Sequence, residues 1–147
     1  MNFQEIIDNK NQYLDLLLLG DEQEEMINHY LNSGRMFILF DKIVKAAFVF
    51  AEIDSSTIEL KNIAVYPKYQ KKGYGRKCLE FIEQMYQGTN KTLIVGTGEV
   101  PSTMGFYKHC GFEYSHRIRN FFIDNYDHII IENGRVLQDM VYLSKKL

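Results

Sequence analysis

Apolar residues in the first part of the chain recur at helical spacing. Residues 3–19 place isoleucine, leucine and tyrosine side chains three and four positions apart, and Gly20 can end that helix. A second helix is expected over residues 21–32, because Asp21 is a good N-cap, Glu24 follows three positions later and Gly34 can close the helix. The pattern therefore predicts two helices before any strand.

The apolar pattern then changes to that of strands. Residues 36–40, 43–53 and 57–65 are β-like runs, separated by turn residues at 41–42 and 54–56. Pro67 ends the third run, since proline cannot donate to a central ladder. These runs predict an antiparallel meander.

Helical spacing returns at residues 74–86 and stops at Gly88, before a short buried strand over residues 91–96. Because that strand follows a strand and a helix, it should run parallel to the strand over residues 57–65.

Three further elements are expected in the last third of the chain. Pro101 suits the first turn of a short helix that ends at Gly111, and residues 112–118 form a strand. An Asn-Gly pair at 133–134 predicts a hairpin between residues 129–131 and 136–143.

This order of elements predicts a mixed α/β (α+β) fold with a mostly antiparallel central sheet flanked by helices. The length of 147 residues suits a single domain over residues 1–147. An apolar fraction of 46% with 24% charged residues is typical of a soluble globular protein.

Charge and cysteine content exclude several classes of partner. The formal net charge of −2 disfavours a general nucleic-acid binder. No apolar run is long enough to span a bilayer and the N-terminus has no signal-peptide pattern, so we expect no membrane partner and a cytoplasmic location. Cys78 and Cys110 form no CxxC or His/Cys cluster, so no metal site is expected and a reducing compartment fits.

Residues 70–76, Gln-Lys-Lys-Gly-Tyr-Gly-Arg, combine glycine and positive charge where a strand gives way to a helix. Two glycines one residue apart allow a tight turn and a close approach of backbone N–H groups to a ligand. The helix start adds unpaired N–H groups and a partial positive charge. With two lysines and an arginine, this segment favours a phosphate or pyrophosphate.

Two nucleotide-binding patterns fit this segment poorly. A Walker-A loop needs Gly-Lys followed by Ser or Thr, and that sequence is absent. The dinucleotide fingerprint needs a third glycine where Cys78 stands.

A third pattern, Q/R-x-x-G-x-G/A, does match, and the surrounding sequence extends the match. Residues 62–67 (Asn-Ile-Ala-Val-Tyr-Pro) resemble the fourth strand of the GCN5-related N-acetyltransferase (GNAT) family, and residues 91–96 stand where its fifth strand should be. Residues 106–112 (Phe-Tyr-Lys-His-Cys-Gly-Phe) resemble its second signature. Over about residues 20–118 the chain therefore resembles this family, as a small bacterial member of unassigned acceptor.

The resemblance implies acetyl-CoA as cosubstrate and a fold in which the parallel fourth and fifth strands splay apart to admit its pantetheine arm. Backbone amides of residues 71–76 would cradle the pyrophosphate, and Ile63 and Val65 would pair with the arm. The implied cofactor-binding residues are Ile63, Ala64, Val65, Gln70, Lys71, Lys72, Gly73, Tyr74, Gly75 and Arg76.

Tyr107 occupies the position of the family's frequent acid tyrosine, near the thioester sulfur. The alternative is a packing tyrosine beside Phe106. The family often has an asparagine early in this helix, and here only Ser102 or Thr103 could replace it. Cys110 is expected to be a buried structural cysteine rather than a nucleophile.

Glu59 is the candidate general base, because period-two alternation places it on the same face as Ile63 and Val65. The alternatives are an ion-pair partner for Lys61, a base at Glu99, and a water held by backbone carbonyls.

The expected activity is transfer of acetyl from acetyl-CoA to a primary amine of a small molecule or peptide, by direct attack in a ternary complex. An acyl-CoA sensor of the same fold, an O-acyl or longer-acyl transferase and a nucleotide-binding domain remain alternatives. Residues 120–128 either pack the core or use Asp124 and Asp127 to bind a cationic amine. The closing strand leaves a sheet edge that allows a homodimer.

Overall fold

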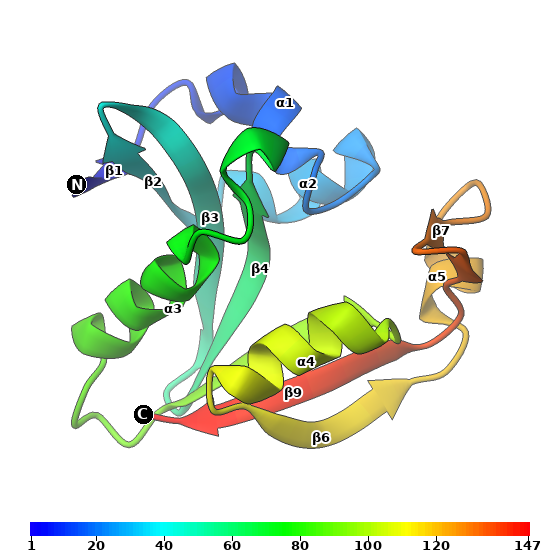
Figure 1. Ribbon diagram of the computed structural model, residues 1–147. Helices are drawn as coiled ribbons and strands as arrows, with labels where there is room; N and C mark the ends of the chain where they lie inside the picture. Colours follow the sequence, from blue (N-terminus) through cyan, green and yellow to red (C-terminus); the bar gives the residue numbers. More distant parts are fainter. The chain divides into compact units, whose positions relative to one another are not determined.

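The computed structural model describes residues 1–147, which form two compact units. The N-terminal unit comprises residues 1–91 together with Leu147, and the C-terminal unit comprises residues 92–146. Each unit has its own antiparallel strands and its own helices (Figure 1). No helix in either unit has the length and apolar character needed to cross a membrane. The single domain over residues 1–147 stays a prediction.

Four antiparallel strands form the sheet of the N-terminal unit. They lie in the order β1 (Asn2–Ile6), β2 (Arg35–Asp41), β3 (Ile43–Asp54) and β4 (Thr57–Val65). The meander predicted over the last three is confirmed.

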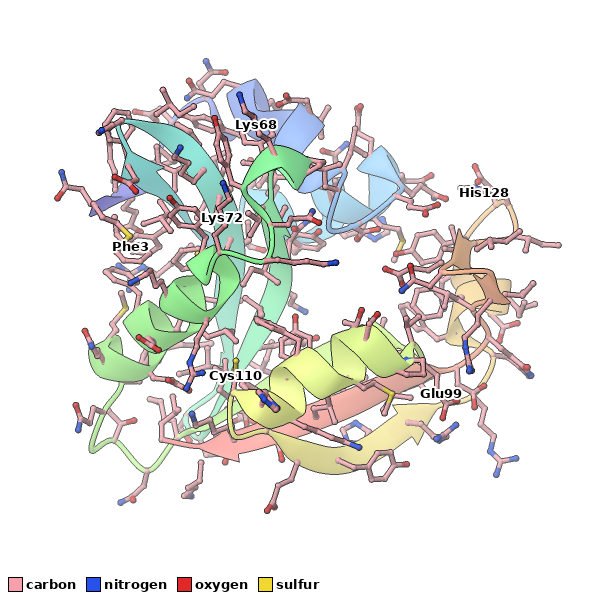
Figure 2. The ribbon with its side chains drawn as sticks, in the orientation of Figure 1. Phe3, Lys68, Lys72, Glu99, Cys110 and His128 are labelled. Carbon is pink, nitrogen blue, oxygen red and sulfur yellow. The ribbon has the colours of Figure 1, made fainter.

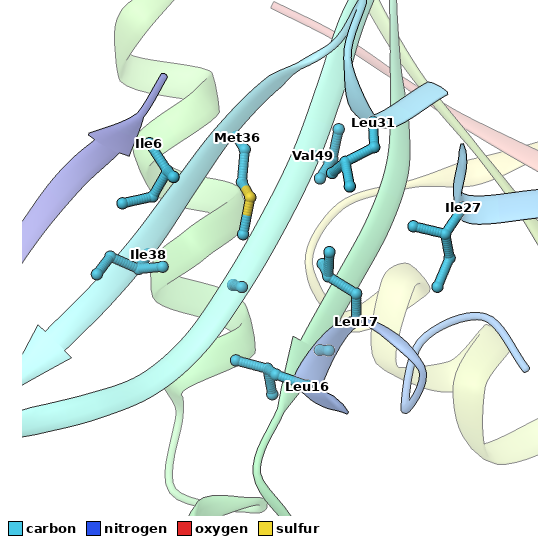
Figure 3. Close-up of a cluster of buried hydrophobic side chains, with 10 residues drawn as sticks. Ile6, Leu16, Leu17, Ile27, Leu31, Met36, Ile38 and Val49 are labelled. Atoms are coloured by element: carbon cyan, nitrogen blue, oxygen red, sulfur yellow. The ribbon is translucent and has the colours of Figure 1, made fainter. Parts of the chain in front are cut away.

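One face of this sheet is covered by η1 (Lys10–Tyr13), α1 (Leu14–Leu17) and α2 (Glu24–Leu31). Helices this short gain most of their stability from burial of an apolar face rather than from propensity. The apolar side chains meet those of the strands in one buried cluster (Figure 3), formed by Ile6, Leu16, Leu17, Ile27, Leu31, Met36, Ile38, Ala47, Val49 and Ala64.

The opposite face is covered by α3 (Tyr74–Met85), which follows the short η2 (Pro67–Tyr69). Phe81 of α3 stacks on Phe3 with ring centroids 4.3 Å apart and lies 5.0 Å from the ring of Phe37. These aromatic contacts fix α3 on the sheet, and with it the loop that precedes the helix.

Three antiparallel strands form the sheet of the C-terminal unit, in the order β5 (Thr92–Gly98), β9 (Met140–Lys146) and β6 (Glu113–Ile118). Helix α4 (Pro101–His109) lies along this sheet (Figure 1). The Nζ of Lys145 donates a hydrogen bond of 2.7 Å to the carbonyl that follows α4, at Cys110. The helix end is thereby tied to β9.

The remaining elements of this unit are α5 (Phe121–Asn125), β7 (Ile131–Glu132) and β8 (Arg135–Val136). Aromatic rings of residues 121–126 surround a small second core, formed by Val100, Phe122, Ile130 and Leu137. Residues 120–128 therefore pack a core, as the first of the two expectations for this segment states.

The start of the chain differs from prediction. Residues 2–6 form β1 rather than the first turns of a helix. Phe3 packs among aromatic rings on the α3 face while Ile6 joins the buried cluster on the opposite face, which is the alternation of a strand. Asn9, in the left-handed region with φ of 54°, then turns the chain into η1.

The predicted capping box of the second helix is also wrong. Helix α2 begins at Glu24, and its N-cap Gln23 makes no side-chain capping bond. The Asp21 carboxylate accepts a long contact of 3.5 Å from the N–H of Gln23, so it shapes the turn before the helix.

The helix predicted over residues 74–86, the strand over 91–96, the helix after Pro101 and the strand over 112–118 are confirmed as α3, β5, α4 and β6. The Asn-Gly hairpin is confirmed too, with φ of 51° and 75° at positions 133 and 134. Its second strand is shorter than predicted, because β8 ends at Val136 and β9 is a separate strand.

Candidate functional site

The loop between β4 and α3 presents unpaired backbone N–H groups beside open space. Gly73 is the N-cap of α3 and has φ of 91°, a conformation that favours glycine. A Cβ built on Gly73 would meet no atom within 4 Å. The preceding Lys71 is also left-handed, with φ of 62°. The N–H groups of the first turn of α3 have no intrahelical acceptors, so an anion can bind them here.

Two side chains of the loop fix its position instead of facing a ligand. Gln70 donates from Nε2 to the carbonyl of Val65 at 3.0 Å, which ties the loop to the end of β4. The Tyr74 hydroxyl donates to Asp41 Oδ2 at 3.0 Å, and this carboxylate raises the pKa of the phenol. The loop is thus held in one shape before any ligand binds, which lowers the entropic cost of binding.

Positive charge dominates this stretch. We define the basic loop as residues 68–77, which hold five lysines and arginines and no carboxylate. Lys71 and Lys72 make no ion pair with the protein's own carboxylates, while Arg76 pairs with Glu80 at 3.3 Å on the exposed surface of α3. Lys68 and Lys72 extend from the chain on either side of the turn (Figure 2). The loop therefore offers cationic side chains beside its backbone donors.

The backbone of β4 presents alternate residues to its free side. The N–H of Tyr66 donates to the carbonyl of Lys45 on β3 at 3.1 Å. Since backbone groups alternate in direction along a strand, those of Ala64 also face β3, and those of Ile63 and Val65 face away from it. Of the three residues expected to contact the cosubstrate, Ile63 and Val65 therefore have the correct backbone direction and Ala64 does not.

A β-bulge interrupts the pairing of β3 with β4. Phe50 lies opposite Leu60, but the next residue of β3, Val49, lies opposite Asn62. Lys61 is therefore an extra residue of β4, with no β3 residue paired opposite it.

The bulge moves Glu59 to the other face of the sheet. Glu59 lies opposite Ala51, while Ile63 lies opposite Phe48. Paired residues share a face, and positions 48 and 51 of a regular strand face opposite sides. Glu59 is therefore on the face covered by α1 and α2. The expectation that it shares a face with Ile63 and Val65 is wrong, because period-two counting does not include the extra residue.

Both candidate bases make ion pairs. Lys61 Nζ lies 2.9 Å from Glu59 Oε1, and the Glu59 side chain is only 16% exposed. The ion pair expected as the alternative for Glu59 is thus present. Glu99 receives both terminal nitrogens of Arg117 at 3.0 and 3.1 Å, and Arg117 also contacts Asp139 at 3.1 Å. This bidentate contact makes Glu99 a structural carboxylate.

A buried polar network links β4 to the first two helices, and no sequence pattern predicted it. Asn62 is 3% exposed, and its Nδ2 donates to the Leu17 carbonyl at 2.9 Å and to the Tyr30 hydroxyl at 3.0 Å. That hydroxyl donates to Asp21 Oδ2 at 3.3 Å. Burial, and secondarily Asp21, raise the pKa of Tyr30. The only sequence signal was one asparagine in an otherwise apolar strand.

Tyr107 lies in α4 of the C-terminal unit and is 4% exposed. Its ring contacts Phe106 and Phe112 edge-on, with centroids 5.1 and 5.5 Å away. Burial is the main cause that raises the pKa of the phenol, and the nearby Cys110 and Glu132 contribute less. The side chain packs as the alternative expected, and it also remains protonated at neutral pH.

Two other expectations concern neighbours of Tyr107. The hydroxyl of Ser102 accepts a bond of 2.9 Å from Asn133 Nδ2 in the hairpin turn. Cys110 is buried, as expected for a structural cysteine, and burial raises the pKa of the equally buried Cys78 to about 12. Neither thiol has the environment of a nucleophile.

Comparison with known proteins extends over nearly the whole chain. The family model described as an acetyltransferase (GNAT) domain matches residues 32–114. The YvbK N-acetyltransferase of Bacillus subtilis (strain 168) is 33% identical over an alignment of 137 residues, and the match covers 90% of this chain and 88% of the relative.

Solved structures agree. A GNAT family acetyltransferase from Elizabethkingia anophelis, with acetyl-CoA bound, has 32% identity and a TM-score of 0.92, covering 99% of this chain and 97% of the other. A B. subtilis acetyltransferase in complex with CoA has 30% identity and a TM-score of 0.88, covering 99% and 98%. The expected mixed α/β fold and acetyltransferase class are confirmed, and the chain belongs to the GNAT family.

Proposed function

We propose that this protein transfers the acetyl group of acetyl-CoA to a primary amine of a small molecule or peptide, by direct attack in a ternary complex. The observation that carries the proposal is the open, left-handed Gly73 at the start of α3, beside two lysines that have no ion-pair partner. A pyrophosphate fits this combination of backbone donors and charge.

The donor binds along the end of β4. Backbone amides of residues 71–76 hold the pyrophosphate, and the outward-facing backbone of Ile63 and Val65 pairs with the pantetheine arm. Because Gln70 already occupies the carbonyl of Val65, the arm pairs there with the N–H of that residue rather than with its carbonyl.

The reaction needs one proton acceptor and one proton donor. The amine lone pair attacks the thioester carbonyl, the new C–N bond forms as the C–S bond breaks, and the amine proton goes to a base. Tyr107 is the proposed donor to the leaving thiolate, because it occupies the position of the family's frequent acid tyrosine in the signature over residues 106–112, and its phenol is protonated at neutral pH. Glu59 is the proposed base, acting directly or through a water.

Release of free CoA from acetyl-CoA in the presence of an amine panel tests this function. Turnover with any primary amine supports it. Binding of acetyl-CoA without turnover of any amine would contradict it and favour a sensor.

Two substitutions test the roles of the side chains. Tyr107→Phe should lower kcat on the order of 10²-fold with little change in the Kd of CoA, while the exposed Tyr114→Phe in the same unit should change neither. Glu59→Gln should remove the acidic limb of the pH–rate profile, and Glu99→Gln should retain it. Persistence of that limb in Glu59→Gln would transfer the role to water.

We further propose that residues 1–147 act as one catalytic domain in the cytoplasm, without nucleic acid or membrane as partner, and that the exposed sheet edge supports a homodimer. Light scattering after gel filtration measures the oligomeric state directly.

A further inference from the structure

A β-bulge in β3 directs a lysine toward the basic loop. The pairing of β2 with β3 skips Lys45, because successive residues of β2 lie opposite Ala46 and Val44. The extra residue of a bulge interrupts the alternation of side chains and can re-aim one of them. Here the Lys45 ammonium lies 3.6 Å from the centroid of the Tyr69 ring. The bulge thus brings a cation of β3 to the start of the basic loop.

The same lysine is joined to this segment through its backbone. Its carbonyl accepts a hydrogen bond of 3.1 Å from the N–H of Tyr66, the residue before η2. The Tyr69 ring, which the ammonium covers, meets the Tyr74 ring edge-on with centroids 6.5 Å apart. Tyr74 follows Gly73 directly and begins α3. Lys45 is therefore fixed beside the turn that forms the proposed pyrophosphate site.

A second cation lies at the same ring, and no carboxylate neutralises either one. The Lys68 ammonium is 6.0 Å from the ring centroid, and its exposed side chain extends from the surface (Figure 2). Lys45 is half-buried, and neither lysine forms an ion pair with the protein. The carboxylates of this region, Asp41 and Asp15, each accept a tyrosine hydroxyl instead. Two cations without a counter-ion repel each other, and a bound anion relieves that repulsion.

The cosubstrate carries more phosphate than the turn at Gly73 accounts for. The proposed pyrophosphate site already combines the backbone amides of residues 71–76 with Lys71 and Lys72. Besides its pyrophosphate, acetyl-CoA has a phosphomonoester on the 3′ oxygen of the adjoining ribose. Such a group has about two negative charges at neutral pH and three strong acceptor oxygens. Lysine ammonium groups bind phosphate as point charges with three N–H donors each.

Resting on the proposed function, we propose that Lys45 and Lys68 form a second phosphate site, which binds the 3′-phosphate of acetyl-CoA. One phosphate group can contact both ammonium groups, because the exposed Lys68 side chain has a flexible stem. The cation–π contact with Tyr69 holds the Lys45 ammonium in place before the ligand binds, which lowers the entropic cost of binding. The site therefore distinguishes acetyl-CoA from a cosubstrate that lacks the 3′-phosphate.

A cycle that removes the phosphate from the ligand and the charge from the protein tests the inference. Calorimetry gives the Kd of CoA and of 3′-dephospho-CoA for the wild-type protein, Lys45→Gln, Lys68→Gln and the double variant. We expect the wild-type protein to bind CoA on the order of tenfold more tightly than 3′-dephospho-CoA. Each single variant should reduce this ratio to about threefold, and the double variant to about one. Lys146→Gln, which removes an exposed lysine of the C-terminal unit, should keep the wild-type ratio.

The ratio separates phosphate contact from a structural role. If Lys45 only supported Tyr69, its loss would weaken both ligands equally and leave the ratio unchanged, and that result overturns the inference. A wild-type ratio of about one also overturns it. Either result, together with acetylation of an amine, leaves the acetyltransferase function standing. A ratio that depends on Lys45 and Lys68, without turnover of any amine, supports the phosphate site and overturns the proposed function.

Discussion

The basic loop and the acidic segment, residues 11–34 with five carboxylates and no lysine or arginine, belong to the same N-terminal unit. They carry equal numbers of opposite charges, yet they present them differently. The basic loop relies on backbone conformation, since Lys71 and Gly73 are left-handed and the start of α3 leaves N–H groups unpaired. The acidic segment relies on side chains supported by a buried network through Tyr30 and Asn62.

This difference teaches which specificity each region can change. A ligand held by backbone donors is insensitive to most substitutions, because every residue other than proline carries the same N–H group. A contact made by a side chain such as the Asp21 carboxylate depends on that side chain and can be altered by a single substitution. The net charge of −2 for the whole chain conceals both regions.

The largest expected effect comes from adding one methyl group to the basic loop. Gly73→Ala should raise the Kd of CoA on the order of 100-fold, or about 2.7 kcal/mol, because the Cβ enters the space left for the pyrophosphate and disfavours φ of 91°. Calorimetry measures this directly.

Gly134→Ala is the matched control, since Gly134 is also left-handed, with φ of 75°, and also has open space around its Cβ position. It imposes similar backbone strain in the hairpin turn. Equal loss of CoA affinity in both variants would show that strain, not cosubstrate contact, causes the effect.

The next largest effect distinguishes the contribution of the lysine side chains of the basic loop to cosubstrate binding from the contribution of its backbone. The double change Lys71→Gln and Lys72→Gln should raise the KM for acetyl-CoA about tenfold, less than Gly73→Ala, because exposed cations contribute modestly to binding. The KM for the amine acceptor should not change. Lys146→Gln, an exposed lysine of the C-terminal unit, is the control. A larger loss than that of Gly73→Ala would reverse the order of backbone and side chain.

Salt should weaken binding of the cosubstrate at the basic loop, by a smaller factor than the substitutions do. Raising the NaCl concentration screens exposed charges, so we expect the KM for acetyl-CoA to rise several-fold. Initial rates across a salt series provide the measurement. A KM for acetyl-CoA that stays constant with salt would argue against the lysines of the basic loop as contacts of the cosubstrate.

The smallest effect concerns the network behind the acidic segment. Tyr30→Phe removes a hydroxyl that donates to Asp21 and accepts from Asn62, so the free energy of unfolding should fall by about 1 kcal/mol. Tyr69→Phe in the basic loop is the matched change and should have little effect. Urea denaturation at neutral pH compares them.

The same variant should change the dependence of stability on pH. The pKa of Tyr30 is raised above its ordinary value of 10.0, so its contribution is complete below that pH and is lost as pH rises toward the folded-state pKa. The wild-type protein should therefore lose stability above that ordinary value more steeply than Tyr30→Phe. Parallel curves for the two proteins would contradict the assignment.

Local signals predicted most of the fold. The meander, the glycine loop, α3, β5 and α4 depend on turn residues, proline and periodicity that act over a few positions. Residues 2–6 were misassigned because their apolar spacing suits both a helix and a strand, and pairing with β2 decided for the strand.

The candidate site likewise has parts that local sequence predicts and parts that it does not. The anion-binding geometry of the basic loop was predicted because one continuous stretch, residues 70–76, contains both of its glycines and three of its cations. The network of Asn62 joins residues 32 and 45 positions apart, and no periodicity reports such a contact. The face of the sheet predicted for Glu59 is wrong for another reason. The bulge lies in an otherwise regular strand, and no feature of the sequence marks it.

The bulge at Lys61 shifts by one residue the alternation of side chains between the two faces of β4. The residues after it keep the orientation that the glycine loop requires, while Glu59 and Leu60 before it lie on the faces opposite to those that an uninterrupted strand would give them. Deleting Lys61 would restore regular pairing and leave every other side chain on its present face. A sheet of this kind can thus absorb one added residue in the first half of β4 without changing the orientation of the residues that lead into the basic loop.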